Sequence, residues 1–156
     1  MNQHAMKILT LLIFIFLFFS FRNIEPGSRH TTNTNRGDTI PFMFGYFNDD
    51  YDILYTINDS LWIQQPGIKY HILKWNKKEQ YCIAKNDDKN PSEAGLYTRI
   101  DYMQFKNMKP WLWGFCYTAY KAKNDSIAEH ALAADRSNPK KGCKGYPFSR
   151  MKKVNE

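Results

Sequence analysis

Apolar and polar residues alternate along much of the chain from residue 39 onward. Ile40, Phe42, Phe44 and Tyr46 are each separated by one residue, and the same period of two recurs over 95–105. This period is typical of strands that bury one face. Short polar turns such as Asn58-Asp59 separate the apolar segments at regular spacing, which predicts antiparallel hairpins. The predicted strands are 39–47, 52–57, 60–64, 69–75, 79–85 and 95–105.

The segment 111–120 contains five aromatic residues and a cysteine. As a strand, it places most of its aromatic residues on one face. As a helix beginning after Pro110, it stacks Trp111 and Phe115 one turn apart. Gly114 and the high aromatic content favour a strand.

We therefore expect a mainly β domain over 39–123, with an α+β fold as the alternative. The domain is predicted to be an antiparallel meander of six to seven strands, forming an open sheet or a small barrel. The segment 111–120 is expected to be its last strand, with Cys116 facing the C-terminal segment.

The C-terminal segment, 124–156, begins with a helix signal. Ser126-Ile-Ala-Glu129 is a capping box, and the Ala-rich sequence after it predicts a short helix over 126–135. Such a short helix needs a sheet to pack against, and apolar residues recur near the C-terminus. We therefore expect the helix and the basic segment after it to pack on the β domain.

The N-terminal part contains an apolar run of 14 residues, 8–21, that follows Lys7. This length fits the central region of an export signal, whereas a spanning helix needs about 20 residues. The first interpretation of 1–22 is an export signal that places the domain in the periplasm or outside the cell. The alternative is a single-pass membrane anchor, because no Ala-x-Ala triplet follows the run. Residues 23–38 are polar and predict a disordered linker.

The formal net charge of +7 is concentrated at the two ends of the chain. Residues 23–135 are almost neutral, whereas 136–156 contain seven basic residues and one acidic residue. The basic side chains that could contact an anionic surface are Lys140, Lys141, Lys144, Arg150, Lys152 and Lys153. An exported protein meets lipid head groups and envelope polymers before nucleic acid, so we do not expect a nucleic-acid partner.

The three cysteines allow three disulfide pairings. We favour Cys116 with Cys143, because this bond ties a Gly-flanked loop to a strand. Cys82 then remains as a small buried apolar residue. The oxidising compartment implied by an export signal permits such a bond.

No motif for a metal, a cofactor or an established catalytic site occurs in the chain. It lacks C-x-x-C, H-E-x-x-H, a P-loop and a nucleophile elbow. One enzymatic alternative is a thiol-dependent activity of Cys143 with His71 or His130 as base, which requires a free thiol. We otherwise expect no enzymatic activity, no metal and no cofactor.

The first functional hypothesis is a binding or envelope-interaction module of unknown ligand. Its candidate contact residues are Trp62, Trp75, Trp111 and Trp113. Binding to an anionic surface through the basic C-terminal segment is a further alternative. The alternating strands, late helix and export signal resemble small calycin-type (lipocalin-like) proteins in general pattern. The Gly-x-Trp typical of the first lipocalin strand is absent, so this resemblance assigns no site residues.

Overall fold

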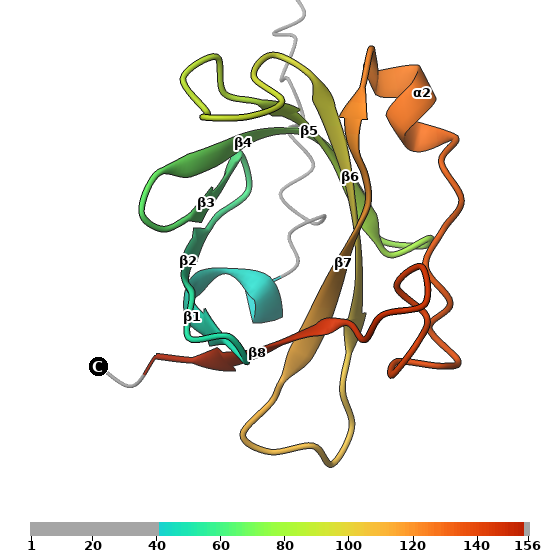
Figure 1. The fold of residues 1–156 in the computed structure, drawn as a ribbon. Coiled ribbons are helices and arrows are strands. Elements are labelled where there is room, and N and C mark those ends of the chain that lie inside the picture. The colour runs from blue at the N-terminus through green and yellow to red at the C-terminus, as the bar shows by residue number, and fades with distance from the viewer. Residues whose placement is uncertain (1–40, 155–156) are drawn as a thin grey trace, which may run out of the picture. The chain divides into compact units, whose positions relative to one another are not determined.

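The computed structural model describes residues 41–154, which form a closed antiparallel barrel of eight strands in sequence order (Figure 1). The predicted export signal or anchor and the predicted linker lie outside the described residues. The strands are β1 (Gly45–Asp49), β2 (Leu54–Ile57), β3 (Leu61–Gln64), β4 (Ile68–Asn76), β5 (Tyr81–Asn86), β6 (Tyr97–Gln104), β7 (Trp113–Ala122) and β8 (Ser149–Lys153). The mainly β fold predicted from the alternation is confirmed, in its small-barrel form.

The last strand of the barrel was not predicted. The segment 111–120 does form a strand, β7, but β8 follows it and pairs with both β7 and β1. Met151 of β8 is fully buried and lies opposite Trp113 and Asp49. The basic C-terminal segment therefore closes the barrel rather than packing on a finished sheet.

The predicted strand over 39–47 is wrong over 41–43. Pro41–Met43 form a short 3-10 helix, η2, and β1 begins only at Gly45, whose φ of 123° redirects the chain. At its other end β1 continues to Asp49, two residues beyond the predicted strand. Met43 of η2 is fully buried in the barrel core.

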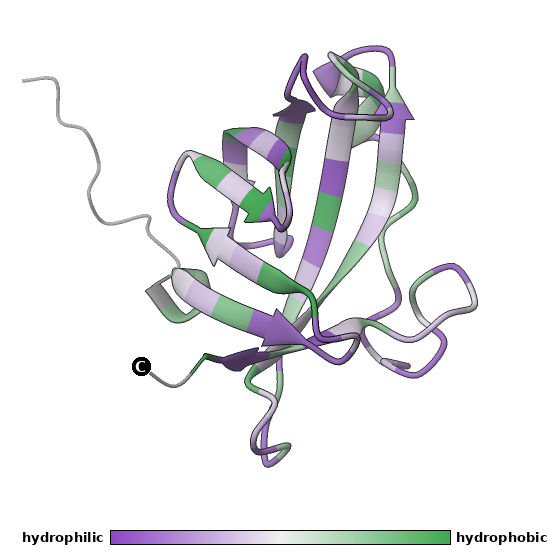
Figure 2. Cartoon of the chain, turned by 60° about the vertical axis from the view of Figure 1, so that its left-hand side comes forward, coloured by the Kyte–Doolittle hydropathy of each residue, from purple (hydrophilic) through white to green (hydrophobic). Residues whose placement is uncertain are grey.

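Aromatic side chains pack the inside of the barrel. Trp62 of β3 lies 5.8 Å from Trp113 and 5.2 Å from Phe115 between ring centroids, in edge-to-face geometry. Apolar and polar residues alternate along the strands in Figure 2, as expected where one face of each strand is inside. An eight-stranded barrel is just wide enough for side chains to fill its interior.

The predicted capping box at Ser126 is wrong, and the predicted helix over 126–135 ends already at Glu129. Helix α2 (Asp125–Glu129) is capped by Asn124, whose side chain accepts a hydrogen bond from the backbone N–H of Ile127. It lies outside the barrel against β5, β6 and β7 (Figure 1). The Ala-rich residues 131–135 leave the helix because Arg136 is held on β6 and Asp135 N–H donates to the Gly142 carbonyl. Tertiary contacts here override helix propensity.

Candidate functional site

Two of the four candidate tryptophans are inaccessible to a ligand at the surface. Trp62 and Trp113 are both 0% exposed in the barrel core. Their indole N–H groups have no hydrogen-bond partner among the described residues. The structure places both side chains in the packed interior of the barrel.

Trp75 is half-buried and contacts Phe44, β6 and the turn at Asp59. Its ring packs 5.9 Å from Phe44 and 6.0 Å from Tyr102, and its Nε1 donates to the Asp59 carbonyl at 2.7 Å. These contacts account for Trp75 as a structural residue at the end of the barrel.

Trp111 is the candidate that the structure places beside basic residues. It lies just before β7, and the Arg150 guanidinium and the Lys152 ammonium lie 4.9 Å and 5.3 Å from its ring centroid. Cations at such distances are attracted to the ring face. Arg150 is also bound by Asp50, whose Oδ2 accepts from Nε at 2.9 Å. The indole is therefore held in one orientation by β8.

Trp111 lines one of two adjoining depressions between the β6–β7 loop and β8. Their volumes are about 590 Å³ and 820 Å³, and they share Lys109, Leu112 and Lys153. We call them together the basic groove. Its other lining residues are Phe42, Asn48, Leu54, Gln104, Phe105, Asn107, Met108, Pro110, Trp111, Lys152 and Val154.

Backbone hydrogen bonds fix the loop that forms one wall of the basic groove. Phe105 N–H donates to the Leu112 carbonyl at 2.9 Å, and Leu112 N–H donates to Met151 of β8 at 2.8 Å. Gly114 allows a close approach here, because a Cβ at this position would lie 2.7 Å from the Phe105 ring. The β6–β7 loop consequently extends beyond the barrel next to β8 (Figure 1).

The basic groove combines positive charge with exposed apolar side chains. Lys109, Lys152 and Lys153 contribute three ammonium groups, and none of the described lining residues is acidic. Four apolar side chains of its walls are exposed: Leu54, Met108, Leu112 and Val154. An anionic group can pair with the lysines while an apolar part contacts these side chains.

The basic C-terminal residues divide into two groups. Lys152 and Lys153 line the groove and Arg150 contacts Trp111, whereas Lys140, Lys141 and Lys144 lie in the loop that carries Cys143 and line neither depression. The sequence-based candidates did not include Lys109, Met108 or Leu112, because they were limited to the tryptophans and to basic residues after 136, and the turn before Trp111 was left out. The combination of Met, Lys and Pro in that turn was the available signal.

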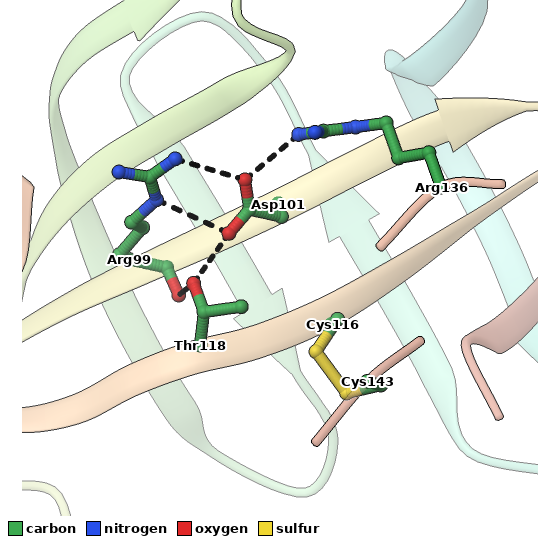
Figure 3. The surroundings of a disulfide bond; sticks show 6 residues. All are labelled: Arg99, Asp101, Cys116, Thr118, Arg136 and Cys143. Carbon is green, nitrogen blue, oxygen red and sulfur yellow. Dashed lines mark hydrogen bonds and ion pairs between the residues drawn. A yellow bond between two sulfur atoms is a disulfide. The ribbon is translucent and has the colours of Figure 1, made fainter. Parts of the chain in front are cut away.

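Cys143 is bonded to Cys116, as predicted, at an S–S distance of 2.01 Å (Figure 3). The sulfur that the thiol-enzyme alternative requires is thus occupied. The two proposed bases have other partners: His71 Nε2 lies 2.7 Å from Asp87, and His130 Nδ1 lies 2.7 Å from the Ser126 carbonyl. The hydrogen bond with His71 lowers the pKa of Asp87 below its usual range.

Cys82 is fully buried in the barrel core, as expected from the sequence. Burial raises the pKa of its thiol well above the ordinary value, with a further contribution from the Asp101 charge. A neutral buried thiol is a poor nucleophile.

A buried carboxylate, Asp101, lies on the outer face of β6 near the disulfide (Figure 3). Its oxygens accept hydrogen bonds from Arg99 at 3.1 Å, from Arg136 at 2.7 Å and from the Thr118 hydroxyl. Arg136 also donates to the Gln80 and Tyr102 carbonyls. Both oxygens of the Asp101 carboxylate therefore have hydrogen-bond partners. Through Arg136, this cluster attaches the C-terminal segment to the barrel.

The described residues 41–154 contain no group of three His, Cys, Asp or Glu side chains arranged to hold a metal ion. Nor does any helix in that range have the length and apolar character needed to cross a bilayer. Comparison of the chain with protein-family models, with curated proteins and with solved structures yields no match. The function must therefore be argued from the residues of the basic groove itself.

Proposed function

We propose that this chain is a non-enzymatic binding module and that the basic groove is its ligand site. The ligand class is an anion that carries an apolar part. The main support is that one groove is lined both by exposed apolar side chains and by Lys109, Lys152 and Lys153. Loop and strand are joined there by backbone hydrogen bonds, so the site is formed before a ligand arrives.

Two features of Trp111 suit it to ligand contact. Its ring is half-buried and oriented by Arg150 and Lys152, which limits the entropy lost on binding. It is also a fluorescent residue within the groove, so binding should change its emission. Trp62 and Trp113 are buried in the core and should respond little.

Monomeric dodecyl phosphate, below its micellar concentration, is a suitable probe with neutral dodecyl maltoside as the comparison. We expect saturable changes in tryptophan emission with dodecyl phosphate only. The change should be lost in Trp111→Phe and retained in Trp75→Phe. Equal responses to both amphiphiles would show that the lysines do not select the ligand.

Two double variants test the charge directly. Lys109→Gln/Lys153→Gln should weaken dodecyl phosphate binding at least tenfold, because hydrogen bonds to charged groups contribute about 1.5–3 kcal/mol each. Lys78→Gln/Lys89→Gln removes two exposed lysines outside the groove and is the matched control. Equal affinities of the two variants would contradict the proposed site.

A further inference from the structure

We propose that the basic groove is a membrane-docking face, which seats the barrel on a bilayer that contains anionic lipids. This inference rests on the proposed function and names its partner. Lipid phosphates would pair with the lysines, and the projecting β6–β7 loop would place Met108 and Leu112 at the acyl boundary.

The composition of the groove agrees with this partner. Exposed apolar residues on a projecting loop, surrounded by lysines, match the division of a bilayer surface into an apolar interior and anionic head groups. Lysine side chains extend along apolar surface toward charge, and tryptophan is enriched at the level of the head groups. The groove has both residue types side by side, because the Lys152 ammonium lies 5.3 Å from the centroid of the Trp111 ring.

The path of the chain gives a second, independent argument. Phe42 of η2 lines the groove, so the described chain enters the barrel at this face. In the sequence, the apolar run 8–21 ends 21 residues before Phe42. The 19 connecting residues, 22–40, can span at most about 65 Å.

If residues 8–21 hold the chain in a bilayer, docking of the groove becomes an intramolecular event. Short flexible connections give effective concentrations in the millimolar range. Even weak lipid contacts would then keep the groove on the surface. The anchor would then hold the chain at the bilayer, and the basic groove would orient the barrel on its surface.

The experiment uses the full chain labelled at one site in the groove. Leu112→Cys is labelled with a polarity-sensitive fluorophore, and Leu73→Cys, at an exposed site on β4, is the control. The buried Cys82 and the Cys116–Cys143 disulfide should not react with the label. Vesicles of phosphatidylcholine alone are compared with vesicles that contain phosphatidylglycerol.

We expect a blue shift of the label at residue 112 with acidic vesicles only, and no shift at residue 73 with either. Lys109→Gln/Lys152→Gln/Lys153→Gln should lower the equilibrium constant for docking of the groove about 100-fold, since each lysine near an anionic bilayer contributes about fivefold. Lys78→Gln/Lys89→Gln/Lys123→Gln should leave it unchanged.

The outcomes separate this inference from the proposed function. A label at residue 112 that stays in water while the chain is bound to acidic vesicles overturns the docking face. If dodecyl phosphate still binds in that case, the groove takes a soluble ligand and the proposed function stands. Loss of both responses removes both proposals. A shift of equal size with neutral vesicles would show insertion without charge recognition and would also contradict the docking face.

Discussion

The two faces of strand β6 are buried by different means. Its inward residues Ile100 and Tyr102 belong to the apolar core of the barrel. Its outward residues Arg99 and Asp101 are just as inaccessible, but the C-terminal segment covers them with ion pairs, hydrogen bonds and a nearby disulfide (Figure 3). The inner region depends on apolar packing, which has little directionality, whereas the outer region depends on specific partners.

The outer face should therefore be the more sensitive to a single substitution. Asp101→Ala leaves the buried Arg99 and the partly exposed Arg136 without their carboxylate, and breaking a buried ion pair costs about 3–5 kcal/mol. Denaturant unfolding monitored by circular dichroism measures this loss. Thr118→Val removes only the hydroxyl partner of Asp101 and should cost less. A loss below about 1 kcal/mol for Asp101→Ala would indicate that solvent already compensates the arginines.

The disulfide should make the next largest contribution to the outer region. Its sequence separation of 27 residues corresponds to about 3.5 kcal/mol in the loop-entropy model. Cys116→Ser/Cys143→Ser should lower the free energy of unfolding by about this amount, and reduction of the wild type should give the same value. Hydrogen exchange should show the loss mainly in residues 130–148. Uniform destabilisation of the inner strands would mean that the two regions unfold as one.

The inner face of β6 should tolerate a change of side-chain shape at Ile100, the residue before Asp101. Ile100→Leu keeps the volume of a fully buried side chain, and such exchanges cost less than about 1.5 kcal/mol. Under the same denaturant conditions, this variant should unfold well after Asp101→Ala. The opposite order would show that aromatic packing inside the barrel is the more specific of the two.

Acid should destabilise the end of α2, with a smaller effect on the free energy of unfolding than the substitutions above. The hydrogen bonds from Lys74 and then Tyr81 lower the pKa of Glu129 below its usual 4.5. The unfolded chain therefore takes up this proton first on acidification. The stabilisation is complete above pH 4.5 and is lost as the pH falls through the lower folded value.

The test compares wild type with Glu129→Gln across this range. The variant should be less stable than wild type at neutral pH, and the difference should shrink below pH 4.5. A constant difference at every pH would show that the Glu129 charge contributes nothing. Asp87 and Asp135 also have lowered pKa values, and they titrate equally in both proteins.

The contrast between the faces explains how far the sequence could be interpreted. Inward positions such as Ile100 follow the period of two. The sequence therefore predicted the meander, the strand in 111–120 and the burial of Cys82. Of three possible disulfide pairings, the Gly-flanked loop favoured Cys116–Cys143, which the structure confirms. The role of β8 did not follow, because Ser149–Lys153 are mostly polar and read as a surface segment.

Asp101 and the basic groove could not be predicted for a related reason. An acidic residue on the polar face of a strand is ordinarily solvated, and only the path of the C-terminal segment buries this one. The groove likewise joins η2, the β6–β7 loop and β8, which are distant in sequence. Of the four tryptophans selected for binding, only Trp111 lies in it.

The most direct test of the basic groove is hydrogen exchange of the full chain bound to neutral and to acidic vesicles. The difference between the two states removes any contribution of the N-terminal run itself. With acidic vesicles we expect additional protection in residues 105–112 and 150–153. We expect none in α2 or in the C-terminal segment that covers the outer face of β6. Protection confined to α2, or no difference between the two vesicle types, would contradict the assignment of the groove as the membrane-facing site.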